Sequence, residues 1–448
     1  MELVWIYALG PVLPRTLKVQ ATVSLQAMRP ALENRAGLFI LRWKKMRNST
    51  VRYLLIVGSL AGGITELQAQ PLEENISRFI PGFEYSLSFR YRMEGVDQDN
   101  ALLDANASTL RSRLTLSAKP ANRLGLIVEI DNVAAVGPDE YDSFALNQYR
   151  GLYSIIPDQE GTEVNLAAAS FAPSVGHNLI LGRQRILHEK QRFIGGVAWR
   201  QNEQTYDALT YNYSSDLFDF DYSHLDEVHR IFGGELPSFQ ITEFDMNGDI
   251  LLGTLKQGWG NTSAYVYALD IENAPALSSL TYGLAYSGKI RGFDADLAWA
   301  RQADYANNPG SSDTNYLAVS FARLLGPVRA LLGYERLGSD NGATAFNTPL
   351  ATLHAFQGWA DIFLNTPSAG IEDAYISLSG SVNELVLTGT YHDFNSEVGS
   401  ADYGSEVDLQ ASYTFNPTVS AAVKFASYRS DTFSVDTDKL WLTINISF

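Results

Sequence analysis

Apolar and polar residues alternate along most of the chain after residue 70. In the segment FEYSLSFRYRME (83–94), apolar side chains occupy every second position and polar side chains the positions between them. The last nine residues, LWLTINISF (440–448), follow the same rule except at Trp441, with Leu440, Leu442, Ile444, Ile446 and Phe448 on one face. Successive side chains of a strand point to opposite faces, so this alternation predicts strands with one apolar face and one polar face.

The pattern predicts eighteen such strands, most of them long. A length of 9–12 residues fits a tilted strand that crosses a membrane, whereas strands of globular sheets average about 5–6 residues. The segment 353–364 (LHAFQGWADIFL) can be counted as a further strand, and a total of 16 also stays open. The predicted strands are 82–94, 107–118, 122–132, 163–172, 178–185, 204–213, 217–225, 248–256, 262–270, 279–287, 291–301, 315–324, 328–337, 371–380, 384–393, 403–415, 418–429 and 438–448.

Short and long connections alternate between these strands. Turns such as 119–121 and 214–216 are short, while the connections 133–162, 186–203 and 338–370 are long. This alternation is typical of transmembrane β-barrels, which have short periplasmic turns and long extracellular loops. We therefore predict an all-β fold, a transmembrane antiparallel β-barrel with both termini in the periplasm of a bacterial cell.

The two ends of the chain carry signals that agree with export to the outer membrane. Residues 46–69 have the basic, apolar and small-residue parts of a secretory signal peptide, and its apolar part is too short to span a bilayer as a helix. Residues 1–45 are interpreted as a spurious or disordered extension, which leaves 70–448 as the barrel. The terminal Phe448 resembles the signal by which barrels of the outer membrane are recognised, so we expect the barrel-assembly machinery to be a partner.

Composition narrows the partners further. Nine of the 33 basic residues and three of the 50 acidic residues lie in 1–69, which leaves 24 and 47 and a net charge of −23 for the barrel. Such a charge argues against nucleic acid as a partner. The chain has no cysteine and so no thiolate metal site or disulfide. The expected surroundings are outer-membrane lipid and lipopolysaccharide, and no cofactor is expected.

In a barrel the apolar face meets lipid and the polar face lines the lumen. By parity, the first two strands turn arginines inward and the third strand turns carboxylates inward. Such charges can select solutes by charge and size, or they can simply solvate the lumen and pair with one another. The inward candidates are Arg90, Arg92, Arg111, Arg113, Glu129 and Asp131, followed by Asp294, Asp296, Arg329, Glu335, Glu406 and Asp408.

A second group of cations lies in the stretch LGRQRILHEKQRFIGGVAWRQNEQTYDAL (181–209). It contains Arg183, Arg185, Arg192 and Arg200, and Gly195–Gly196 would let the connection bend into the lumen. Arg183 shares the parity of outward-facing leucines. Either the strand has left the membrane at that point, or a bulge reverses its faces.

No catalytic or metal-binding residues are expected. The six histidines are scattered, and none lies in an HExxH or nucleophile-elbow pattern. His188 next to Glu189 is interpreted as a solvated loop pair. The stretch DQDN (97–100) lacks the glycine and the terminal glutamate of a calcium-binding EF-hand loop.

Several longer motifs resemble the alginate-export-domain family of bacterial outer-membrane porins. They are RYRMEGVDQD (90–99), EIDNV (129–133), EGTEVN (160–165), LGRQRI (181–186), RFIG (192–195), WRQNEQTYDA (199–208) and TPLATLHAFQGWAD (348–361). The resemblance covers nearly all of 70–448. It implies a monomeric 18-stranded channel, with the arginines at 90, 92, 183, 192 and 200 in the lumen and its constricting loop.

The leading hypothesis is a passive outer-membrane channel, not an enzyme, for a hydrophilic solute of anionic or saccharide-like character. Its narrower version names alginate or another polyuronate as the solute. Two alternatives stay open: a barrel enzyme acting on lipid or peptide, and a plugged structural or adhesion barrel whose long loops bind outside partners.

Overall fold

The computed structural model describes residues 80–145, 148–233 and 241–448. They belong to one compact unit, Ile76–Phe448. The predicted extension (1–45) and signal peptide (46–69) lie outside the described residues. No helix in the described part of the chain is long and apolar enough to cross a membrane.

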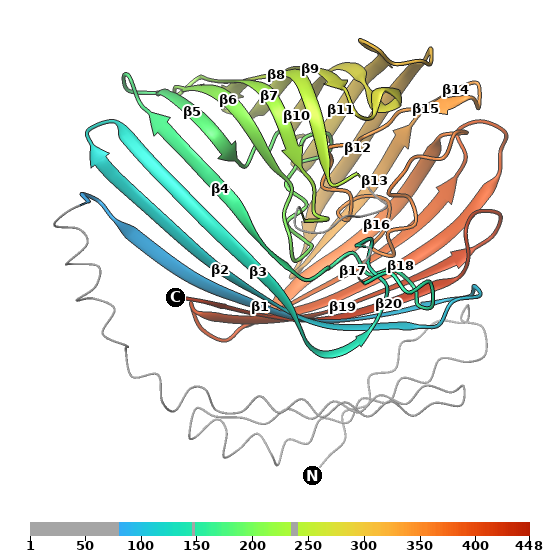
Figure 1. Cartoon of the computed structure of the whole chain (residues 1–448). Coiled ribbons are helices and arrows are strands. Elements are labelled where there is room, and N and C mark those ends of the chain that lie inside the picture. The colour runs from blue at the N-terminus through green and yellow to red at the C-terminus, as the bar shows by residue number, and fades with distance from the viewer. Residues whose placement is uncertain (1–79, 146–147, 234–240) are drawn as a thin grey trace. The chain divides into compact units, whose positions relative to one another are not determined.

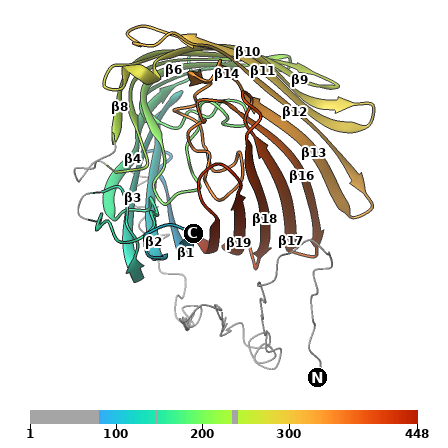
Figure 2. The same ribbon diagram turned by 90° about the vertical axis from the view of Figure 1, so that its right-hand side faces the viewer.

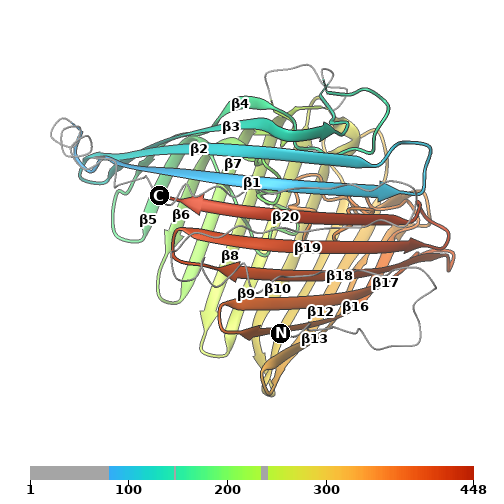
Figure 3. The same cartoon turned by 90° about the horizontal axis from the view of Figure 1, so that it is seen from below.

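The described residues form an 18-stranded antiparallel sheet in which each strand pairs with the next along the chain (Figure 1). The sheet closes because β1 also pairs with β20, from Ser88 opposite Ser447 to Gln98 opposite Thr437. Figure 3 shows β1 between β2 and β20. The barrel strands are β1 (Glu84–Gln98), β2 (Ala105–Ala121), β3 (Leu124–Glu140), β4 (Gly161–Phe171), β5 (His177–Gln184), β6 (Thr205–Ser214), β7 (Phe218–His229), β8 (Glu243–Gln257), β9 (Gly260–Ile271), β10 (Ser279–Ile290), β11 (Phe293–Asp304), β12 (Asp313–Leu325), β13 (Val328–Leu337), β16 (Ile371–Val382), β17 (Leu385–Asn395), β18 (Asp402–Thr414), β19 (Val419–Ser430) and β20 (Thr437–Ser447).

The prediction of a closed all-β barrel with 18 strands is confirmed. Each predicted segment overlaps one barrel strand, but several strands extend beyond the residues that alternate in polarity. β3 continues to Glu140, well into the predicted loop 133–162, because its extension stays paired with β2 up to Asn106. Segment 353–364 is not a strand. It belongs to the connection that follows the two-residue strands β14 (Ser339–Asp340) and β15 (Thr344–Ala345).

The two faces of the barrel wall have the polarity that the sequence predicts. On β3, Leu126, Val128 and Ile130 are exposed on the outer face, while Glu129 and Asp131, at the alternate positions, are buried on the inner face. A closed barrel leaves its outer apolar face without protein contacts, and in membrane barrels the corresponding face meets lipid. The buried side chains therefore lie inside the barrel, under the connections that fold into it.

Long connections from one end of the barrel fold inward (Figures 1 and 2). Two of them are named here by their flanking strands: the β5–β6 loop (residues 185–204) and the β15–β16 loop (residues 346–370). Ile194 of the first and Leu350 of the second are fully buried and form a parallel β-bridge with each other. The two loops thus support each other inside the ring of strands.

The chain ends at the seam where the barrel closes. The backbone N–H of Phe448 donates to the carbonyl oxygen of Leu87 at 2.9 Å, and Leu87 N–H donates back to Phe448 at 3.2 Å. Phe448 is exposed, at 61 % of the full accessible area of the residue. The expected recognition of this residue by the assembly machinery stays a prediction.

Candidate functional site

Four arginines on β1 and β2 form a basic wall on the inner face of the barrel. Arg90 lies directly opposite Arg111 in the antiparallel pairing, and Arg92 and Arg113 are two residues further along their strands. Because side chains two positions apart share a face, all four guanidinium groups extend inward from neighbouring strands. Their arrangement agrees with the parity of the sequence.

Arg113 is neutralised by the inward carboxylates of β3. Its Nε and Nη2 bind the two oxygens of Asp131 at 2.7 and 2.6 Å, which is a bidentate pair. Glu129 lies 3.3 Å from the same guanidinium. The register of β2 against β3, with Arg113 opposite Asp131, brings these groups together.

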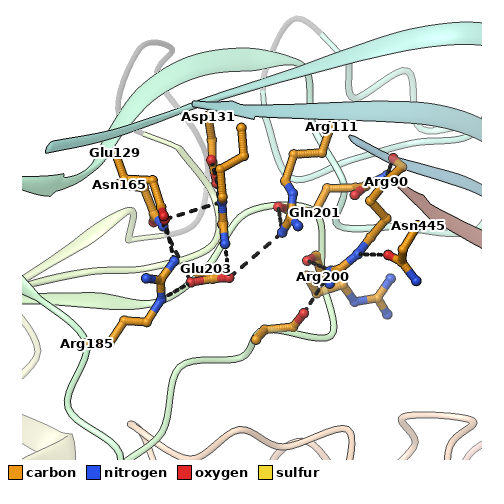
Figure 4. A network of polar contacts seen from close by, with 12 residues as sticks. Arg90, Arg111, Glu129, Asp131, Asn165, Arg185, Arg200, Gln201, Glu203 and Asn445 are labelled. Carbon is orange, nitrogen blue, oxygen red and sulfur yellow. Dashed lines mark hydrogen bonds and ion pairs between the residues drawn. The ribbon is translucent and has the colours of Figure 1, made fainter. Parts of the chain in front are cut away.

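The β5–β6 loop adds a further carboxylate to this network (Figure 4). Glu203 accepts hydrogen bonds from Arg113 at 2.7 Å and from Arg185 at 2.6 Å, and Arg185 also binds Glu129. Burial alone would raise the pKa of Glu203, but the two arginines lower it to about 2. Glu203 is therefore a fixed anion that ties the loop to the wall.

Arg200 fastens the same loop at a second point. Its Nη1 lies 2.9 Å from Glu94 of β1, and its Nη2 lies 2.8 Å from Asp361 of the β15–β16 loop. All three side chains are almost completely buried. Lys439 of β20 reaches Asp361 as well, at 3.2 Å. Two loops and the strands at the seam are thus joined by one buried network.

Arg90 and Arg111 hold carboxylates less closely than Arg113, Arg185 and Arg200 do. Arg90 binds neutral acceptors only: Asn445 at 3.2 Å and two carbonyl oxygens of the β5–β6 loop at 2.9 and 3.2 Å. Arg111 donates to the carbonyl oxygen of Gln201, and its ion-pair partner Glu203 is 3.8 Å away. No carboxylate of the described residues forms an ion pair with Arg90. We call these two side chains the Arg90–Arg111 notch (Figure 4).

A cage of aromatic rings surrounds Lys424 of β19 and holds the two loops together. The ammonium group lies 3.6 Å from the ring centre of Trp359 and 4.2 Å from that of Trp199, so each loop contributes one ring. Lys424 also donates a hydrogen bond to Nε2 of His354 at 2.7 Å. The His354 ring in turn stacks on Trp199. Cation–π contacts of this kind stabilise a buried ammonium.

The tip of the β5–β6 loop packs on the wall opposite β1. Phe193 contacts Tyr265 and Tyr267 of β9 and Tyr316 of β12 at ring-centre distances of 5.0–6.4 Å. Next to it, Arg192 binds Glu335 of β13 at 2.6 Å. Since Arg200 of the same loop binds β1, the loop crosses the lumen from one wall to the other.

Most of the arginines expected in the passage lie in these inward contacts, but Arg183 does not. Its Nε and Nη2 bind the two carboxylate oxygens of Asp207 of β6, each at 3.0 Å, and it shares the outer face with the exposed Leu179 and Leu181. The pairing of β5 with β6 is continuous from His177 to Gln184, so no bulge reverses its faces. The expectation that Arg183 lines the passage is therefore corrected: its side chain lies outside, at the end of β5 where the long loops begin.

His188 also differs from its interpretation as a solvated loop residue. It is 4 % exposed, and its ring packs at a tilt against Tyr267 of β9, with the ring centres 5.6 Å apart. Burial lowers its pKa to about 4. The imidazole is therefore neutral and packs as part of the loop's contact with the wall.

Several carboxylates and one cation of the site were not among the predicted site residues. Glu94 has the inward parity of Arg90 and Arg92, and this signal was available in the sequence. Lys424 of β19 likewise shares the inward parity of the buried Ala426. Glu203 and Asp361 gave no comparable signal, because they lie in irregular loops.

Comparisons with known proteins extend only to the fold. No family model matches the sequence, and no curated protein sequence matches it. Membership of the alginate-export family is accordingly not confirmed.

Among solved structures, Pseudomonas aeruginosa OccK3 (OpdO) matches with a TM-score of 0.62 and 13 % identity, over 83 % of this chain and 97 % of that one. Acinetobacter baumannii OccAB4 matches with a TM-score of 0.63 and 12 % identity, over 82 % and 98 %. Pseudomonas aeruginosa OpdK, solved with vanillate, gives 0.63 and 12 % over 82 % and 99 %. The chain is an 18-stranded barrel of the outer-membrane type and resembles these Occ channels in fold.

Proposed function

We propose that the protein is a passive outer-membrane channel for small hydrophilic anions. The observation that carries this proposal is the Arg90–Arg111 notch: two neighbouring inward guanidinium groups, one of which has no carboxylate partner among the described residues. A guanidinium between low-dielectric walls attracts anions strongly, and its planar donors match a carboxylate. The proposed solutes are small carboxylates and acidic sugars.

The contacts between the loops favour small solutes over a polymer such as alginate. The β5–β6 loop is bound to β1 through Arg200 and to β13 through Arg192, and the Ile194–Leu350 bridge joins it to the β15–β16 loop. A polyuronate chain needs a wide continuous path, which loops bound to both walls would narrow. In the same proposal the short-turn end and both termini face the periplasm, and the gradient sets the direction of flow.

Ion selectivity in planar lipid bilayers tests the proposal. Under a salt gradient the purified barrel should give discrete conductance steps and a reversal potential that shows preference for anions. Arg90→Ala and Arg111→Ala should each shift that potential towards cation preference. Arg429→Ala is the matched control, because Arg429 pairs with Asp438 and is half-exposed, and it should behave like the wild type.

Three results would contradict this function. A folded barrel without conductance would favour the plugged structural or adhesion barrel. A wild-type channel that prefers cations would remove the role of the notch. To identify the solute, small carboxylates such as vanillate are added, and they should reduce the single-channel current. A current that is reduced by uronate oligomers but not by small carboxylates would favour a polyuronate as the solute instead.

A further inference from the structure

A cluster of charged residues lies on the outer face of the barrel, at the end where the long loops begin. It consists of Arg183 of β5, Asp207 of β6, Glu227 and His229 of β7, and Glu243 of β8, and is called the outer cluster here. These four strands are consecutive in the sheet (Figure 1). On the same face, two residues away, Leu181 and Leu209 are exposed, so the cluster borders the apolar band of the barrel.

Three side-chain atoms of the outer cluster converge on one point. His229 Nε2 lies 3.0 Å from Asp207 Oδ2 and 3.8 Å from Glu227 Oε2, and all three ligand atoms lie within 4.8 Å of one another. The local backbone explains this convergence. A bulge between Leu225 and Glu227 puts Glu227 and His229 on the outer face, beside Asp207.

Glu243 orients the imidazole from behind. Its Oε1 lies 3.1 Å from His229 Nδ1, so a proton on Nδ1 is donated to this carboxylate when Nε2 binds a metal ion. A histidine held in this way by a carboxylate presents its other nitrogen as a ligand, and metal-binding histidines in proteins have this arrangement. Without a metal ion, a proton on Nε2 makes the hydrogen bond to Asp207 at 3.0 Å, and a bound ion would take the place of that proton.

The net charge of the outer cluster also favours a metal ion as its ligand. Three carboxylates surround one guanidinium and one imidazole, so a neutral His229 leaves two negative charges and a protonated one leaves one. A divalent cation balances the cluster completely. Arg183 occupies one side of Asp207, and since each carboxylate oxygen has two lone pairs, Oδ2 can still bind a metal.

We propose that Asp207, Glu227 and His229 form a binding site for a divalent metal ion such as zinc, with Glu243 as the positioning residue for His229. One nitrogen and two carboxylate oxygens are ligands that zinc accepts, and three protein ligands leave a coordination position open. The ligands come from two strands and their support from a third. A bound ion therefore ties β6, β7 and β8 together at this end of the barrel.

Zinc titration of the refolded barrel in detergent, followed by calorimetry, tests this site. The wild type should bind one zinc ion per chain and its melting temperature should rise with zinc. His229→Ala should remove both effects, and Glu243→Gln should weaken binding by about 10–100-fold. The matched control is His224→Ala. His224 lies on β7 as well, but it faces a single carboxylate, Asp249, at 3.1 Å, and its loss should leave zinc binding unchanged.

The opposite results are equally clear. If the wild type binds no zinc, His229 is a protonated imidazolium held by its three carboxylates, and the metal site does not exist. Zinc binding that survives His229→Ala but not His224→Ala would place the ion elsewhere. Ion selectivity of the channel does not enter this test, so either proposal can fail without the other.

Discussion

The guanidinium of Arg200 lies 2.9 Å from the carboxylate of Glu94, and both side chains are almost completely buried. Arg200 belongs to the β5–β6 loop and Glu94 to β1, which are 106 positions apart in the chain. This pair, with Asp361 as its third member, fixes the loop across the lumen.

Removing Arg200 should therefore loosen the loop. Arg200→Ala leaves Glu94 and Asp361 as buried carboxylates with one cation fewer, and breaking a buried pair in this way costs about 3–5 kcal/mol. Denaturant unfolding of the refolded barrel measures this loss. Single-channel recordings should show a larger and noisier open current.

The half-exposed pair of Arg429 and Asp438 provides the control for that experiment. Exposed pairs contribute about 0–1 kcal/mol, so Arg429→Ala should unfold close to the wild type and conduct like it. Equal losses for the two variants would mean that the Arg200 network does not hold the loop.

The packing of the loop tip gives an independent test. Phe193 is buried among Tyr265, Tyr267 and Tyr316, and removing such a ring from a packed core costs about 3–5 kcal/mol. Phe193→Ala should destabilise the loop and raise the open-channel conductance. Leu187→Ala, at a half-exposed position of the same loop, should change stability by less than about 1 kcal/mol. An unchanged conductance in Phe193→Ala would show that the tip does not restrict the passage.

Because His354 is buried as a neutral ring, we expect the free energy of unfolding to fall at acidic pH. Burial, opposed by the neighbouring Asp361, lowers the pKa of His354 from 6.5 to about 3. The unfolded chain takes up a proton near its ordinary pKa, while the folded chain keeps the ring neutral between Asp361 and Lys424. The contribution of the neutral His354 ring to the free energy of unfolding is therefore complete above the ordinary pKa. It is lost as the pH falls from about 6.5 towards 3.

Unfolding free energies of the wild type and His354→Gln, compared between about pH 7 and about pH 4, measure this contribution. The wild type should lose more stability over this interval than the variant, because the carboxylates common to both cancel in the comparison. His224→Ala, which removes an exposed histidine, should keep the wild-type dependence. A parallel pH dependence in His354→Gln would show that the ring is not held neutral.

Gly358 lies where the β15–β16 loop packs tightly against the wall. It has a φ of +80°, and a Cβ added there would lie 2.4 Å from Oε2 of Glu406, whose other oxygen accepts a hydrogen bond from Ala360 N–H at 2.7 Å. Gly358→Ala should therefore displace the loop. Gly342 has nearly the same φ, +84°, with nothing within 4 Å, so Gly342→Ala reports the backbone strain alone, about 1–2 kcal/mol. Unfolding experiments should show a clearly larger loss for Gly358→Ala.

The alternation of apolar and polar residues was enough to predict the barrel fold. The alternation in 83–94 predicts both faces of β1, and the wall positions of Arg90, Arg92, Arg111 and Arg113 follow from the same period of two. The short turns and the long connections then specify a barrel, because only a closed sheet pairs every strand while it presents an apolar outer face. The ends of the strands were less predictable: β3 continues to Glu140, where pairing with β2 replaces the alternation.

The sequence by itself determined the barrel, its strand order and the inward parity of its wall, since these depend on neighbours one or two positions apart. Only the tertiary structure decided what the loops do. It placed Arg200 on Glu94, put Phe193 against the far wall and assembled the cage around Lys424. It also placed Arg183 outside, where β6 supplies Asp207. These contacts join residues that are far apart in the chain, and irregular loop backbone has no periodicity from which a partner can be read.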